Sequence, residues 1–196
     1  MHSFSAAIAG LLLSACSLSS GAQVTAVVGG NPNHIDLSIP VTASVATRCG
    51  LAIGGTYSAP DINAGFAHDF ELALQCNVPS RVAVESLHGG LLTPVSTPPG
   101  YSSLAPYQIT LHLVGDAGVV SVSAGCEARV LTASASVPCS FKGPASTSQG
   151  LLLDGANSNV TGSYLRVSAP VYAGVDKLVA SPDYADTLTV TLSAAL

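Results

Sequence analysis

The stretch DFELALQC, residues 69–76, places Phe70, Leu72, Leu74 and Cys76 on one side of an extended chain. Successive side chains of a β-strand point to opposite faces of the sheet. A period of two over this length therefore predicts a half-buried strand. The same pattern recurs along the chain and decides the fold class.

Alternating runs and turn signals follow one another through the sequence. The runs lie at residues 34–39, 82–86, 109–113 and 187–193. Between them stand turn-forming groups such as Gly89-Gly90, Gly143-Pro144 and Asp154-Gly155. No segment has the 3.6-residue period of a long helix. The pattern predicts an all-β sandwich or barrel, with long loops at residues 91–105 and 144–150.

The chain has few charges for its length. It has 196 residues, of which 48% are hydrophobic and 9% are charged, whereas an ordinary domain carries about 25% charged residues. The net charge of -5 argues against a nucleic-acid binder that relies on a basic patch. Ser and Thr take the polar strand positions. Strand edges are therefore left uncharged, although most proteins use charge to keep edges from recruiting other strands.

The N-terminus predicts export. The run AAIAGLLL, residues 6–13, is too short to span a bilayer and fits the apolar region of a signal peptide. One interpretation removes residues 1–22 by cleavage before Gln23, after the small residues Ser20 and Ala22. The other is a lipoprotein signal that ends before Cys16, which would be lipidated. Both place the protein in the periplasm or at the cell surface.

The cysteine count agrees with export. Of the five cysteines, Cys16 is removed or lipidated, which leaves Cys49, Cys76, Cys126 and Cys139. Four cysteines in an exported protein predict two disulfides. Three pairings are possible, of which the local one joins Cys49 to Cys76 and Cys126 to Cys139. The sequence does not choose among them.

Catalytic and metal-binding motifs are not found. The sequence has no nucleophile elbow, zinc-protease helix, phosphate loop or dinucleotide fingerprint. His68 and His112 are interpreted as surface or loop residues, and Asp69 and Glu71 as solvated residues of one strand face. We therefore expect no catalytic residue, no metal ligand and no cofactor, and we expect that the protein is not an enzyme.

Three segments form a further pattern. The run VTASVATRC, residues 41–49, ends in a cysteine; FELALQCNVP, residues 70–79, is followed by VESLHGGL, residues 84–91; and YADTLTVTL, residues 184–192, lies near the C-terminus. Together they resemble the spore coat protein U (SCPU) domain and the related subunits of archaic chaperone–usher pili. That group shares an early Cys, a strand-Cys-Asn element, a Ser…Gly-Gly-Leu turn and a closing Tyr-x-Asp-Thr strand.

The resemblance implies a fold and a function. The fold is an immunoglobulin-like, pilin-type β-sandwich over residues 41–196 that is incomplete and is completed by a donor strand. The function is that of a structural pilus or fimbria subunit in surface adhesion or biofilm formation. The implied partners are a periplasmic chaperone, an outer-membrane usher and neighbouring pilus subunits. This chain departs from the group in its C-terminal residues Ala194-Ala195-Leu196, where an aromatic is usual, and in its insert at residues 91–105.

The N-terminal extension, residues 23–40, is the candidate donor. It contains two runs in which apolar residues alternate with others. The residues expected to face the acceptor are Val24, Ala26, Val28, Ile35, Leu37 and Ile39. The acceptor-groove strand implied by the resemblance is the terminal one, with Leu188, Val190 and Leu192. The extension is equally well explained as a leader followed by the first strand of a complete sandwich.

A second function is also compatible with the sequence. An exported or lipid-anchored β-sandwich can bind a glycan or another ligand through a long loop. Tyr101 and Tyr107 would supply the aromatic faces of such a surface.

Overall fold

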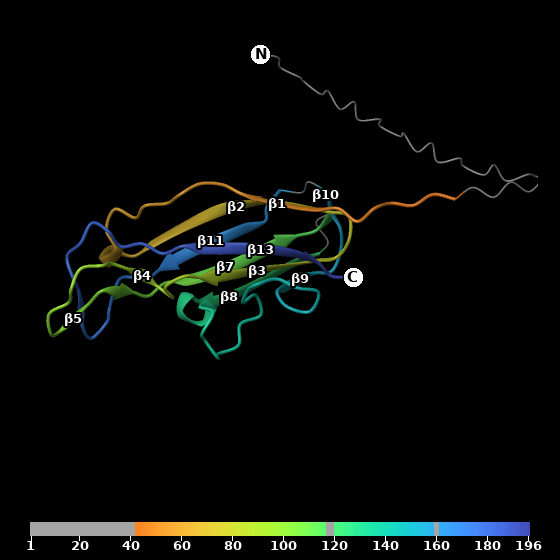
Figure 1. Ribbon diagram of the computed structural model, residues 1–196. Coiled ribbons are helices and arrows are strands. Elements are labelled where there is room, and N and C mark those ends of the chain that lie inside the picture. The colour runs from red at the N-terminus through yellow and green to blue at the C-terminus, as the bar shows by residue number, and fades with distance from the viewer. Residues whose placement is uncertain (1–41, 117–119, 159–160) are drawn as a thin grey trace, which may run out of the picture. The chain divides into compact units, whose positions relative to one another are not determined.

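The alternating stretch at residues 69–76 forms most of the longest strand, β2 (Phe66–Cys76). The structure is a computed structural model that describes residues 42–116, 120–158 and 161–196 (Figure 1). The compact unit that contains β2 spans Ala46–Leu196. Its strands are almost all antiparallel, so the predicted all-β class is confirmed.

Two sheets form the sandwich. The larger has the strand order β1 (Cys49–Ile53), β2, β11 (Tyr164–Ala169), β7 (Gln108–Val114) and β8 (Ser121–Glu127), with β10 (Asn157–Ser158) paired to the end of β2. The smaller has the order β13 (Leu188–Ala194), β3 (Ser80–Ser86) and β9 (Leu151–Leu153). Short pieces complete the fold: β4 (Leu91–Leu92) pairs with β6 (Leu104–Ala105), and β5 (Tyr101–Ser102) pairs with β12 (Lys177–Leu178). Among the described residues, the 3-10 turns η1 (Ile62–Ala64) and η3 (Ala128–Leu131) lie between strands.

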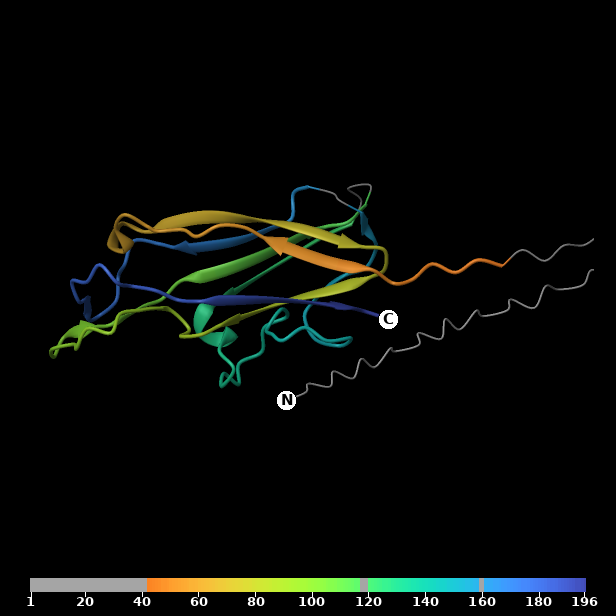
Figure 2. The ribbon, with the colours of Figure 1, turned by 45° about the horizontal axis from the view of Figure 1, so that its top comes forward.

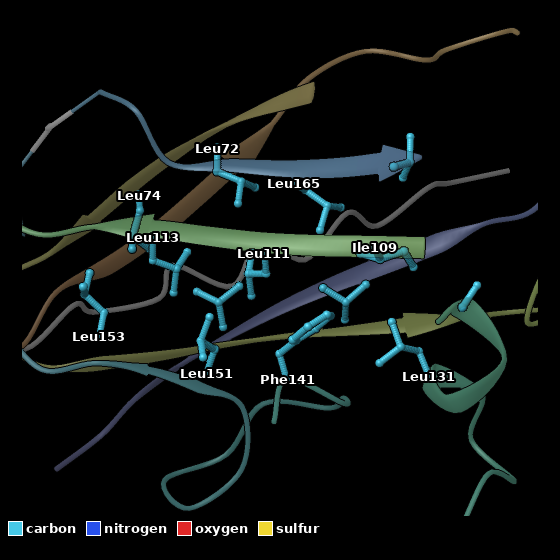
Figure 3. Close-up of a cluster of buried hydrophobic side chains, with 14 of the residues drawn as sticks. Leu72, Leu74, Ile109, Leu111, Leu113, Leu131, Phe141, Leu151, Leu153 and Leu165 are labelled. Carbon is cyan, nitrogen blue, oxygen red and sulfur yellow. The ribbon is translucent and has the colours of Figure 1, made fainter. Parts of the chain in front are cut away.

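The core lies between the two sheets, as the alternation predicts. Ile109, Leu111 and Leu113 of β7 have no exposed surface, and they face Val82 and Val84 of β3, which are equally buried. Figure 3 shows these layers meeting, with leucines of both sheets pointing into one cluster. Burying a side chain of this size stabilises the fold by about 1.5–3 kcal/mol relative to leaving it exposed. The unexposed row of β7 alone is therefore a large part of the driving force.

Three expectations about local structure need correction. The segment at residues 91–105 is not a plain loop, because it contains β4, β5 and β6. The run at residues 41–49, interpreted as a strand that ends in Cys49, is not that strand, because β1 begins at Cys49. The strands β8 and β11 were not predicted, and neither were the shorter β9, β10 and β12. Small residues in β8 (SVSAGCE) weaken the apolar half of the alternation, so the sequence signal is faint.

One long side of the sandwich is closed by irregular chain. On β3, the backbone of Val84 bonds to residues of the segment 139–143: its N–H donates to the carbonyl of Phe141 (2.8 Å), and its carbonyl accepts from the N–H of Gly143 (2.9 Å). Phe141 is fully buried. The Cys126–Cys139 disulfide ties the same segment to β8. This segment therefore takes the place that a further strand would occupy.

Candidate functional site

On the opposite long side of the sandwich, two strand edges have no partner in the part of the chain that the structure describes. Within the described residues, β1 is the last strand of the larger sheet and β13 is the last strand of the smaller one. The two strands lie close to each other across the layers (Figure 2). Neither strand contains a charged residue or a proline, which are the devices that usually protect an edge. We call this pair of strands the open edge.

The inward-facing side chains of the open edge are incompletely covered. On β13 these residues are Leu188, Val190 and Leu192, the ones predicted for the acceptor strand, and all are only partly buried against the core. The adjacent Val82 and Val84 on β3 have no exposed surface. The difference has a simple cause, because β3 has neighbours on both sides and β13 has one. A strand added beside β13 would cover this row.

The backbone of β13 is held firmly in register on its paired side. Its residues match β3 one for one, from Leu188 opposite Ser86 to Ala194 opposite Ser80. Beyond the strand, the N–H of Ala195 donates to the carbonyl of Pro79 (2.9 Å). The open edge is thus a preformed edge whose backbone direction is fixed by the sheet behind it.

A carboxylate cluster anchors the beginning of β13. Asp186 accepts hydrogen bonds from the hydroxyl of Ser86 (2.6 Å), the hydroxyl of Tyr107 (2.8 Å) and the backbone N–H groups of His88 (3.0 Å) and Thr187 (2.8 Å). Ser86 also accepts from the N–H of Gly89 (2.7 Å). One side chain thereby joins β3, the turn that follows it, and the residues directly before β7 and β13.

The surroundings of Tyr107 change the pKa of its phenol. Tyr107 is only 5% exposed. Burial, together with the negative charge of Asp186, raises the pKa of the Tyr107 phenol far above its usual value. The phenol therefore stays protonated and remains a hydrogen-bond donor to the carboxylate.

This cluster explains two elements that the sequence pattern contained without assigning them a role. The Ser…Gly-Gly-Leu turn supplies Ser86, and the closing Tyr-x-Asp-Thr strand supplies Asp186. Tyr107 was expected on a loop surface, and that expectation is wrong. The sequence did not reveal the cluster because Tyr107 and Asp186 are 79 residues apart.

The four remaining cysteines form two disulfides, as the count predicted. The structure pairs Cys49 with Cys76 and Cys126 with Cys139, which is the local solution. The first bridge joins β1 to β2 at the end of the open edge, and the second belongs to the closed side. The first disulfide therefore fixes the start of β1 to the end of β2, and the second fixes the segment 139–143 to β8.

The predicted donor residues cannot be placed. Val24, Ala26, Val28, Ile35, Leu37 and Ile39, together with Cys16, lie outside the described residues. Their proposed contacts with the open edge stay a prediction.

The tyrosines predicted for a ligand-binding loop do not share a surface. Tyr101 is 42% exposed, whereas Tyr107 belongs to the core. The exposed faces of other rings are partly taken: Tyr164 stacks on His112 with centroids 4.9 Å apart, and the guanidinium of Arg166 lies 5.2 Å from the Tyr164 centroid. A paired aromatic platform is therefore not formed by the residues that the sequence suggested.

Two expectations about polar strand residues are refined. Asp69 does not merely solvate its face, since Arg166 donates to it from Nε (2.6 Å) and from a terminal nitrogen (2.7 Å). These bonds lower the pKa of the Asp69 carboxyl below its usual range. His68 is one of the inward-facing residues of β2. The ring of Tyr57 stacks on its imidazole with centroids 4.3 Å apart, and the ring of Phe70 meets it edge-on with centroids 4.7 Å apart.

Other kinds of site have no support in the part of the chain that the structure describes. There, no three His, Cys, Asp or Glu side chains gather as metal ligands would. No helix within the described ranges has the length and apolar character needed to cross a membrane. Comparison with protein-family models, curated proteins and solved structures gives no match.

Proposed function

We propose that this protein is an exported structural subunit of a pilus or fimbria, assembled by donor-strand complementation. In this mechanism the N-terminal extension of one copy adds a strand to the open edge of the next. The fibre acts at the cell surface in adhesion or biofilm formation. The partners are a periplasmic chaperone that occupies the edge first, an outer-membrane usher and neighbouring subunits.

The observation that carries the proposal is the asymmetry of the sandwich. On the side of β8 and β9, the segment 139–143 bonds to β3, buries Phe141 and is tied to β8 by a disulfide. On the other side, two uncharged strand edges have no partner among the described residues, and the row Leu188, Val190 and Leu192 is half-buried. An added strand would supply both the missing backbone partner and the missing cover. Its main-chain hydrogen bonds would pair with the strand edge, and its alternate side chains would cover the half-buried row.

The sequence of the extension supports the same occupant. Ile35, Leu37 and Ile39 repeat at the spacing of two that separates Leu188, Val190 and Leu192. Equal spacing allows three apolar side chains of a donor to meet three of the acceptor. The extension also contains no proline between Ile35 and Ile39, so each residue of that run has a backbone N–H to donate.

The experiment compares two charge insertions in the extension of the full exported chain. Leu37→Asp places a carboxylate on the predicted inward face, and Ser38→Asp places the same charge on the opposite face. Wild type and Ser38→Asp are expected to form concentration-dependent oligomers, measured by size-exclusion chromatography with light scattering. Leu37→Asp is expected to stay monomeric, because an unpaired charge is costly to bury.

Two results contradict the proposal. Equal oligomerisation of both variants would show that the extension is not inserted with this face inward. A wild-type chain that stays a stably folded monomer at every concentration would favour the alternative interpretation of the extension as the first strand of its own sandwich.

A further inference from the structure

Asn77 is the second residue of the Cys-Asn element and lies outside the two strands of the open edge. It lies at the end of β2, is exposed to solvent and makes three hydrogen bonds to the chain before β1. Its N–H donates to the carbonyl of Arg48 (3.1 Å), its Oδ1 accepts from the N–H of Arg48 (2.8 Å), and its Nδ2 donates to the carbonyl of Ala46 (2.9 Å).

These bonds continue the β1–β2 ladder beyond its last backbone pair. The antiparallel register ends with Cys49 opposite Cys76, so Arg48 and Asn77 would be the next pair. At this point the chain turns toward β3, which begins at Ser80. A carboxamide carries the same donor and acceptor as a peptide group. The Asn77 side chain therefore supplies the bonds that the departing backbone of β2 no longer makes.

We propose that Asn77 is a positioning residue for strand donation, which holds Ala46–Arg48 in line with β1 and makes Ala46 the fixed root of the N-terminal extension. This inference rests on the proposed function. Without the side-chain bonds of Asn77, the nearest fixed point is Cys49, which the disulfide holds to Cys76. Ala46 and Thr47 would then have no bond to Asn77 until a donation event ordered them, while Arg48 would keep the bond from the backbone N–H of Asn77 to its carbonyl.

The physical advantage of a fixed root is preorganisation. Residues that are already extended before the extension meets a second copy do not have to be ordered during docking, so the entropy cost of that step falls. We expect that loss of the Asn77 bond to the Ala46 carbonyl alone lowers donation about tenfold. Acceptance of a strand is a property of β13 and is expected to stay unchanged.

The test is Asn77→Asp in the full exported chain. Aspartate can still accept from the Arg48 N–H, but it has no N–H for the Ala46 carbonyl and sets a carboxylate oxygen against it. Donation is measured as the cross-linking yield to wild-type chain from a photoreactive phenylalanine analogue at position 37. Acceptance is measured separately, as binding of a fluorescent synthetic peptide of residues 23–40 to the same variant.

The matched control is Asn63→Asp, which makes the same exchange at an exposed residue of η1, whose side chain bonds to Asp61. The inference predicts a donation yield about tenfold lower for Asn77→Asp, near wild-type donation for Asn63→Asp, and acceptance within twofold of wild type for both. Unchanged donation by Asn77→Asp overturns it. A parallel loss of donation and acceptance also overturns it, because that result describes general damage to the fold. If the wild-type chain neither cross-links to a second copy nor binds the peptide, the proposed function itself fails, and this inference fails with it.

Discussion

Replacing Asp186 by alanine should be among the most damaging single substitutions at the open edge. Asp186 accepts four hydrogen bonds, two of them from the buried hydroxyls of Ser86 and Tyr107. A buried donor left without a partner costs about 1–3 kcal/mol. Ser86 keeps its bond from Gly89, so its share lies at the low end. The two exposed backbone N–H groups can turn to water and add little.

The expected loss is therefore about 3 kcal/mol of unfolding free energy, out of a total of about 5–15 kcal/mol for a natural domain. For a domain of this size, such a loss lowers the Tm by roughly 6–12 °C. Asp186→Asn should cost less than Asp186→Ala, because the amide keeps one acceptor oxygen and a hydroxyl can rotate to accept from its NH2.

The assay is urea unfolding of the full chain at a concentration where it is monomeric, followed by far-UV circular dichroism and tyrosine fluorescence. The chain has no tryptophan, so the tyrosine signal is not masked. Asp183→Ala is the control, since Asp183 is exposed in the same segment and should change stability by less than about 0.5 kcal/mol. A loss below about 1 kcal/mol for Asp186→Ala, or an equal loss for Asp183→Ala, would refute the anchoring argument.

Two further predictions concern pH. The folded-state pKa of Tyr107 is raised, so its contribution to stability is complete below the unfolded value of about 10 and is lost as the pH rises above it. Tyr107→Phe should be less stable than wild type by about 1 kcal/mol at neutral pH. Its urea midpoint should nevertheless fall less than that of wild type between pH 9 and about 11. An equal fall of the urea midpoint in both chains over this range would contradict the prediction. The folded-state pKa of Asp69 is lowered, so its contribution is complete above the unfolded value of about 3.9 and is lost as the pH falls through the folded value. Carboxyl titration by NMR should give Asp69 a titration midpoint below that value in the wild-type chain. In Arg166→Gln the midpoint should return toward the ordinary value. An equal midpoint in both chains would show that the ion pair is not formed in solution.

The sequence predicts those elements whose two faces differ strongly. In β2, β3 and β7 the apolar row is buried and the other row is polar or small, so alternation reveals both the strand and its inward face. It fails for β8, where small residues occupy both faces, and for Phe141, a lone aromatic in a Pro- and Ser-rich stretch. Phe141 is in the core because backbone bonds to Val84 carry its segment there.

The candidate site divides in the same way. Leu188, Val190 and Leu192 share one face by period alone, and the number of cysteines predicts two disulfides. These three side chains are only half covered because of the strand order in the sheet. That order puts β13 last, and β13 lies close to β1, which comes from the other end of the domain sequence. Local sequence determines which residues of a strand face inward, because side-chain direction follows from the backbone. Only the tertiary structure decides which strand lacks a neighbour, because that depends on contacts between residues far apart in the chain.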